Sequence, residues 1–162
     1  MGVLGTVRTF VSTVTNKIDG KGRVSVPAPF RQALALQGAS HFYCFKSFNE
    51  PALEAYGPSL MEKIEARIGD LDPFSEEYDQ LVRCILGGSQ EQTFDAEGRT
   101  KLPPAFLDHA KITSHVVFVG MGFKFQIWDP ATLEPLNETD TEMARQGHGV
   151  LGSRPASAGG HS

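Results

Sequence analysis

A short segment that occurs twice is the feature that most constrains the fold of this chain. The first copy reads DGKGRVSVP over residues 19–27, and the second reads DAEGRTKLP over residues 95–103. A phenylalanine, Phe30 or Phe106, stands three residues after the final proline of each copy. Asp, Gly, Arg, Pro and Phe thus recur in register at a constant offset of 76 positions (95 − 19). Two copies are too few for a solenoid, so the repeat predicts two half-domains that form one body.

Each copy predicts a tight turn that opens into a short strand and then a helix. An Asp side chain can accept a hydrogen bond from the backbone two residues on, and Gly adopts a positive φ without steric cost. Apolar residues then alternate with polar ones, so Val24 and Val26 are predicted to face a core while Arg23 and Ser25 face solvent. Pro27 suits the end of the strand and the start of a helix. The turn would therefore hold a basic side chain in a fixed position.

Other interpretations of the motif are weighed against this one. In the simplest, the segment is a hairpin turn with solubilising charges, although such a turn has no need to repeat its arginine. In another, Arg23 only pairs with Asp19 across the turn. A nucleotide-binding loop is disfavoured because the chain has no G-x-x-x-x-G-K-[ST] segment. A calcium loop is disfavoured because the required carboxylates do not follow Asp19.

The distribution of charge is uneven along the chain. The net charge of −4 over 162 residues does not by itself indicate a nucleic-acid-binding protein. Residues 16–31 nevertheless carry a net +3, and residues 50–83 carry a net −6. A basic patch on an acidic body suits the steered binding of an anion, and the alternative is an accidental patch. The basic residues of the patch are Lys17, Lys21, Arg23 and Arg31.

The segments around the first repeat give strand and helix signals in turn. An extended first strand is predicted over residues 7–18. A helix over residues 30–37 is predicted to end at Gly38, because glycine commonly terminates helices. A strand follows from Phe42, Cys44 and Phe45. Apolar spacings of three and four predict helices over residues 51–68 and 74–86, the second ending at a Gly-Gly pair.

The second repeat is predicted to follow the same plan as the first. Beyond about residue 145 the chain is rich in Gly, Ser, Ala and Pro, so residues 145–162 are predicted to be disordered. The elements predicted before that tail are a strand over residues 92–94, a helix from Pro103 to near His109, strands over residues 116–119 and 123–128, and a final helix that includes Leu133 and Leu136.

The remaining reactive residues favour no enzyme class. The two cysteines, Cys44 and Cys84, lie among apolar neighbours and are interpreted as buried thiols of a cytoplasmic protein. No secretory signal or membrane-length apolar run is found. The five histidines lack H-x-H and H-E-x-x-H spacing, and no G-x-S-x-G segment exists. His109 and His115 could share a site, but a surface or hydrogen-bonded role is favoured. We therefore expect no catalytic residue, metal ion or cofactor.

The chain carries the segment FQIWD at residues 125–129, which follows Gly120. In this segment and in the two copies of the repeated segment, the chain resembles the MraZ family of bacterial transcriptional regulators. The resemblance covers roughly residues 10–136. It implies an α+β fold in which two SpoVT-AbrB-type half-domains form a swapped-hairpin, double-psi-like β-barrel with peripheral helices. The implied organisation is half-domain 1 at residues 10–56, a helical connector at 57–88, and half-domain 2 at 89–136.

The resemblance also implies a function. The protein would be a sequence-specific DNA-binding transcriptional regulator, expected to repress, that acts on direct repeats in the promoter of the cell-division and cell-wall operon. It would assemble as a ring-shaped homo-oligomer, with double-stranded DNA and itself as partners and with no membrane or small-molecule substrate, in the cytoplasm at the nucleoid. The alternative is an antitoxin-like or structural oligomer without a promoter role. The DNA-binding residues implied by the matching positions are Lys21 and Arg23, with Arg31, Lys17 and Arg99 beside them.

The second repeat departs from the first at two positions. It has Glu97 in place of Lys21 and Leu107 in place of Arg31. Its turn and following helix start are therefore electrically neutral overall. We expect the second repeat to make a weaker contact with DNA or to be mainly structural.

Overall fold

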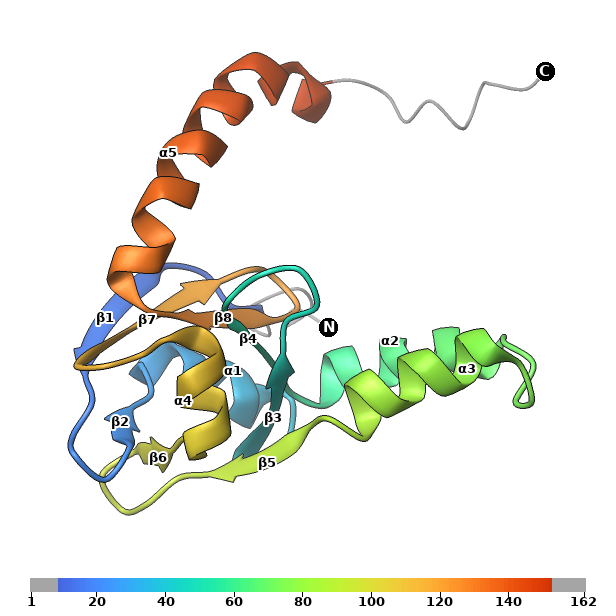
Figure 1. Ribbon diagram of the computed structural model, residues 1–162, viewed down its shortest axis with the longest axis horizontal. Helices are drawn as coiled ribbons and strands as arrows, with labels where there is room; N and C mark the ends of the chain where they lie inside the picture. The colour runs from blue at the N-terminus through green and yellow to red at the C-terminus, as the bar shows by residue number, and fades with distance from the viewer. Residues whose placement is uncertain (1–8, 153–162) are drawn as a thin grey trace. The chain divides into compact units, whose positions relative to one another are not determined.

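Two β-sheets form the framework of the chain (Figure 1). The computed structural model describes residues 9–152, which divide after Pro130 into two compact units. The larger sheet has the strand order β1-β7-β8-β4-β3-β5, and β2 and β6 form a separate two-stranded ribbon. Every neighbouring pair of strands is antiparallel. The strands are β1 (Thr13–Lys17), β2 (Arg23–Ser25), β3 (His41–Lys46), β4 (Leu53–Tyr56), β5 (Gln90–Thr93), β6 (Arg99–Lys101), β7 (His115–Gly120) and β8 (Phe125–Trp128).

The two half-domains exchange strands. β1 of the first half pairs with β7 of the second, and β5 of the second half pairs with β3 of the first. The two hairpins, β3–β4 and β7–β8, meet where β4 pairs with β8. At the centre of the ribbon, Val24 of one repeat lies opposite Thr100 of the other, its counterpart 76 positions on. The body therefore has a pseudo-two-fold axis, and the predicted combination of two halves in one body is confirmed.

The α+β class is confirmed, whereas the closed barrel stays a prediction. In the described part of the chain, the backbone ladders form an open six-stranded sheet and the ribbon. Equivalent side chains connect the ribbon to the sheet in each half. Asn16 Nδ2 donates to the Ser25 carbonyl at 2.8 Å, and Gln92 Nε2 donates to the Lys101 carbonyl at 2.8 Å.

The core is built from aromatic residues of both halves. Phe125 is fully buried, and its ring centroid lies 4.8 Å from that of Phe10, 4.9 Å from that of Phe30 and 5.3 Å from that of Phe42. Offset and edge-on aromatic pairs at such distances add to the stability that burial provides. The prediction that Val24 faces this core is confirmed. Because residues from both repeats share the core, neither half has an apolar centre of its own.

Helices α1 (Ala28–Leu36) and α4 (Pro104–Ala110) follow the two copies of the motif, as predicted. Each begins directly after the motif's last proline, and each has a second proline in its first turn, where the missing N–H costs nothing. Gly38, with φ of +87°, ends α1 as expected.

The helix predicted over residues 51–68 is wrong in its first part. Residues Leu53–Tyr56 form β4, and helix α2 (Pro58–Gly69) begins only after Gly57. All four residues of β4 are buried, including Glu54. A strand covered on both faces shows no two-residue alternation, so its apolar residues merged with the helical pattern that follows.

The remainder of the connector agrees with its predicted helical character. Helix α3 (Glu76–Leu81) continues into a π-helical turn, Val82–Leu86. Ser75 caps α3 by accepting a hydrogen bond from the backbone N–H of Tyr78 at 3.2 Å. Of the first strand, predicted over residues 7–18, residues 7 and 8 lie outside the described residues. In the described part the strand is shorter than predicted, because β1 begins at Thr13 and Ser12 has a φ of +83°.

The second unit carries all but the first residue of helix α5 (Pro130–Gly147) and a 3₁₀ turn, His148–Gly152. The sequence predicted disorder from residue 145, but the helix continues through that point. Arg145 Nη1 lies 3.0 Å from Glu142 Oε1, an i,i+3 pair of the kind that supports exposed helices. Residues 153–162 of the predicted tail lie outside the described residues. In the described ranges, no helix combines the length and the apolar character needed to cross a bilayer.

Candidate nucleic-acid interface

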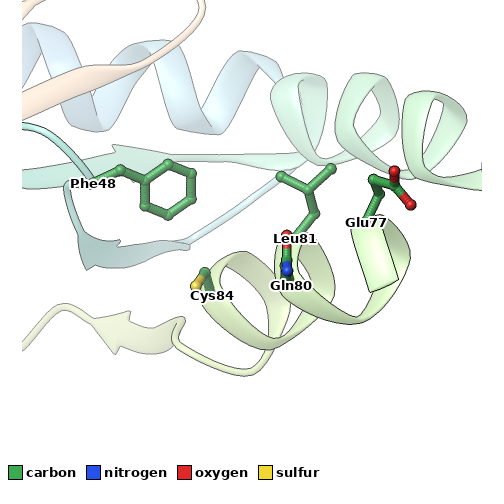
Figure 2. A pocket seen from close by; sticks show the side chains of 5 residues that line it. All are labelled: Phe48, Glu77, Gln80, Leu81 and Cys84. Carbon is green, nitrogen blue, oxygen red and sulfur yellow. The ribbon is translucent and has the colours of Figure 1, made fainter. Parts of the chain in front are cut away.

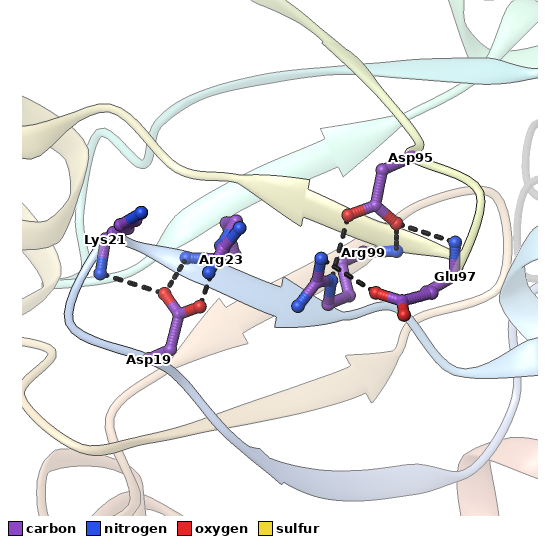
Figure 3. A network of polar contacts seen from close by, with 6 residues as sticks. All are labelled: Asp19, Lys21, Arg23, Asp95, Glu97 and Arg99. Atoms are coloured by element: carbon purple, nitrogen blue, oxygen red, sulfur yellow. Dashed lines mark hydrogen bonds and ion pairs between the residues drawn. The ribbon is translucent and has the colours of Figure 1, made fainter.

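The turn of the first repeat is organised by Asp19. Its Oδ1 accepts hydrogen bonds from the backbone N–H groups of Lys21 and Arg23, both at 2.9 Å (Figure 3). Its Oδ2 accepts from Arg23 Nε at 2.7 Å. These bonds favour the ionised carboxylate and lower the pKa of Asp19 to about 2, with the bond from the Arg23 backbone as the largest cause. The turn therefore fixes the direction in which Arg23 leaves the strand.

The turn of the second repeat has the same construction. Asp95 Oδ1 accepts from the backbone N–H groups of Glu97 at 2.8 Å and Arg99 at 3.0 Å, and Oδ2 accepts from Arg99 Nε at 2.8 Å. The backbone bond from Arg99 is the main reason that the pKa of Asp95 is lowered. One contact is added: Glu97 Oε1 lies 2.8 Å from Arg99 Nη2 (Figure 3). The pKa of Arg99 is raised, mainly by its side-chain hydrogen bond to Asp95 and further by the negative charge of Glu97.

The ribbon brings both arginines to one place. Arg23 lies opposite Lys101 and Ser25 lies opposite Arg99, so the outward positions of β2 and β6 alternate between the repeats. A hollow of about 220 Å³ opens beside them, and Lys17 also lines it. Three of the five predicted site residues, Lys17, Arg23 and Arg99, therefore surround a single hollow, although they come from different repeats.

Arg31 belongs to the first repeat in sequence, but its side chain lies against the turn of the second repeat. Its Nε donates to the Val26 carbonyl at 3.1 Å, and its guanidinium covers the turn of the second repeat. A Cβ placed on Gly98 would come within 2.8 Å of Arg31 Cζ, and φ at Gly98 is +77°. In the equivalent place, Leu107 of the second repeat approaches Gly22 of the first. The two helices thus exchange their covering residues, and the charge of Arg31 belongs to the second turn.

Comparison with known proteins places this arrangement in a family. The model of the family described as "MraZ protein, putative antitoxin-like" matches the chain twice, over residues 9–84 and 85–148. The chain belongs to the MraZ family. It is 44% identical over 145 residues to "Transcriptional regulator MraZ" of Xanthobacter autotrophicus, covering 90% of this chain and 92% of that protein. The protein of the same name from Azorhizobium caulinodans is 42% identical over 150 residues, covering 93% and 96% of the two chains.

The predicted residues of this MraZ chain differ in how freely they could bind an anion. Lys21 is exposed, and among the described residues only its backbone N–H makes a hydrogen bond, to Asp19. Arg23 uses Nε for Asp19 and makes no second ion pair within residues 9–152. Lys101 is a further exposed basic residue that the sequence analysis missed. It is the counterpart of Ser25 at the 76-residue offset. Because Ser25 was predicted to face solvent, the same prediction for its counterpart would have identified Lys101 as exposed.

A second hollow on this MraZ chain is lined mainly by residues of the connector. It has a volume of about 410 Å³ and lies between α3 and the segment that carries Phe48 (Figure 2). Cys84 lines it and is exposed, so the prediction of a buried thiol is wrong there, while Cys44 is buried as predicted. Burial raises the pKa of the Cys44 thiol. The lining has one thiol and one carboxylate, that of Glu77, and no histidine that could act as a base.

The histidines within residues 9–152 form no common site. His109 Nε2 lies 3.2 Å from the Glu50 carbonyl, and His115 Nδ1 lies 3.0 Å from Ser114 Oγ. Across residues 9–152, no group of His, Cys, Asp and Glu is arranged to hold a metal ion. The basic ribbon and its two turns are thus the best candidate site.

Proposed function

We propose that this chain is a cytoplasmic DNA-binding transcriptional regulator, and that its β2–β6 ribbon and the flanking turns contact DNA. The observation that carries the proposal is the fixed setting of Arg23, whose Nε is held 2.7 Å from Asp19 Oδ2 and whose side chain lines the hollow shared with Lys17 and Arg99. The name of the relatives, transcriptional regulator, supports the same function.

The shape of the ribbon suits a groove of the double helix. The major groove of B-DNA admits a two-stranded antiparallel ribbon, and an arginine fork can pair with the O6 and N7 atoms of guanine. Arg23 on β2 is assigned this role. Lys21, a flexible point charge on the adjoining turn, suits a phosphate group. Lys17 and Arg99 border the same hollow, and Arg31 is assigned a supporting role through the second turn.

We further propose a ring-shaped homo-oligomer that binds direct repeats in the cell-division and cell-wall operon promoter and represses it at the nucleoid. We call the DNA-contacting ribbon and turns of one subunit a head. When several heads are linked in one ring, binding of one head to its repeat raises the local concentration of the next head at the adjacent repeat. Large apolar residues are exposed on and near the connector, at Phe48, Phe74 and Leu81, and we assign subunit contacts to them. Light scattering at micromolar concentration should report an oligomer, and a monomer would contradict the ring.

A binding experiment tests the proposed function. The full chain is titrated into duplex DNA taken from upstream of its own gene, with a random-sequence duplex of equal length as the control. We expect a shift of the upstream duplex at moderate salt, at protein concentrations that leave the random duplex free. Absence of any shift at low salt would contradict DNA binding. Equal shifts of both duplexes would favour the antitoxin-like or structural alternative over a promoter role.

A further inference from the structure

The two turns differ in the number of acidic groups that hold the arginine. Arg99 Nε lies 2.8 Å from Asp95 Oδ2, and Arg99 Nη2 lies 2.8 Å from Glu97 Oε1. Arg23 has the first of these contacts, with Asp19, but Lys21 stands in the place of Glu97. Among residues 9–152, the guanidinium of Arg99 is therefore engaged by two carboxylates, and that of Arg23 by one.

Access to solvent does not distinguish the two arginines. The side chain of Arg23 is 36% exposed and that of Arg99 is 31% exposed. Both line the same hollow, at pseudosymmetric positions of one ribbon. The difference between them lies in bonding, because a DNA phosphate or base that approaches Arg99 must compete with the Glu97 carboxylate.

Local charge acts in the same direction. The first turn carries Asp19, Lys21 and Arg23, a net charge of +1. The second turn carries Asp95, Glu97 and Arg99, a net charge of −1 before the covering Arg31 is counted. With the charge of Arg31 included, the second turn is neutral, which is still less positive than the first turn. The hydrogen bond from Arg31 Nε to the Val26 carbonyl holds the Arg31 guanidinium against the second turn.

We propose that Glu97 is a positioning residue that holds Arg99 away from DNA, so that each subunit presents one reading arginine, Arg23. This inference rests on the proposed DNA-binding function. A ribbon with two equal turns would match a site of two-fold symmetry, whereas unequal turns give each subunit a direction along the duplex. A subunit with a direction is suited to repeats that all run the same way, and a ring can then place successive subunits on them.

Replacing Glu97 tests the inference. Glu97→Gln keeps the size of the side chain and removes its charge, so that a phosphate approaching Arg99 Nη2 competes with a neutral amide oxygen instead of a carboxylate. We expect the log–log salt slope of binding to random-sequence duplex DNA to steepen by about 0.9, which corresponds to about fivefold tighter binding near 0.15 M salt. Glu62→Gln is the matched control, since it makes the same charge change on α2 at an exposed position away from the ribbon.

A double variant separates an effect through Arg99 from an effect of net charge. In an Arg99→Ala background, Glu97→Gln should leave the salt slope unchanged. An equal steepening with and without Arg99, or an unchanged slope in the single variant, would overturn the inference.

A measurement without DNA distinguishes failure of this inference from failure of the proposed function. Nitrogen-15 NMR of the arginine side chains should show slower guanidinium rotation for Arg99 than for Arg23, with the difference lost in Glu97→Gln. Equal rotation in the unaltered protein would overturn the role of Glu97. Absence of binding to any duplex, with the rotation difference present, would instead overturn the proposed function.

Discussion

Arg23 combines a fixed position with side-chain N–H donors that find no partner among residues 9–152. A guanidinium has five N–H donors, and Asp19 Oδ2 engages the one on Nε at 2.7 Å. If the others pair with a guanine, we expect Arg23→Ala to weaken binding to the upstream duplex by roughly 1–3 kcal/mol per engaged head. Titration of that duplex, with thermal unfolding measured in parallel, checks the prediction. A folded Arg23→Ala protein that binds at wild-type concentration would show that Arg23 only completes the turn.

Arg99→Ala and Lys21→Ala are the comparisons for this variant. Because Glu97 already engages Arg99, its removal should weaken DNA binding less than removal of Arg23. Lys21→Ala should weaken binding to all sequences alike and flatten the salt dependence by about 0.9. A larger loss in Arg99→Ala than in Arg23→Ala would reverse the assignment of the two arginines.

Asp19 links the integrity of the first turn to pH. Its pKa falls from 3.8 to about 2 in the folded state. A carboxyl whose pKa is depressed by folding stabilises the protein above its unfolded pKa, and that stabilisation is lost as pH falls through the folded pKa. We therefore expect the urea midpoint to decline as pH falls from 3.8 towards 2, with a shallower decline in Asp19→Asn. Asp140→Asn, an exposed control on α5, should decline like the unaltered protein.

At the scale of the element, β4 joins the two halves. Leu53 is fully buried and lies opposite Ile127 of β8. Truncation there would leave a cavity in the shared core, so we expect Leu53→Ala to lower the free energy of unfolding by roughly 2–5 kcal/mol. Leu36→Ala is the control, because Leu36 ends α1 with half of its surface exposed. Urea unfolding measures both, and equal small losses would contradict the placement of Leu53 in the central sheet.

At the scale of the whole molecule, the exchange of β1 and β5 makes each half depend on the other. Cutting the chain between Gly69 and Asp72 separates β1 from β7 and β3 from β5, so either fragment alone should be unfolded or aggregated. Co-expressed fragments should associate into one folded body, because the cut lies in the connector and leaves every strand intact. Circular dichroism and proton NMR check both outcomes. A single fragment that is folded and monomeric would contradict the interdependence of the halves.

The sequence by itself determined the local features of this protein. These features are the duplicated turns, the inward direction of Val24 and Val26, and the helix starts after Pro27 and Pro103. Each depends on interactions or alternation within a few residues and therefore follows from residue type and spacing. The sequence alone was also enough to count the repeats and to recognise the resemblance to the MraZ family.

The tertiary structure decided which segments meet. Residues 53–56 form a strand because β3 and β8 flank them, although their spacing resembled a helix. Arg31 covers the second turn and Leu107 the first because the halves exchange strands, which moves a charge from the repeat that encodes it to the other. Cys84 is exposed although its neighbours are apolar. For residues 53–56, Arg31 and Leu107 the outcome depends on contacts between distant parts of the chain, and the periodicity of a short segment carries no information about its partner.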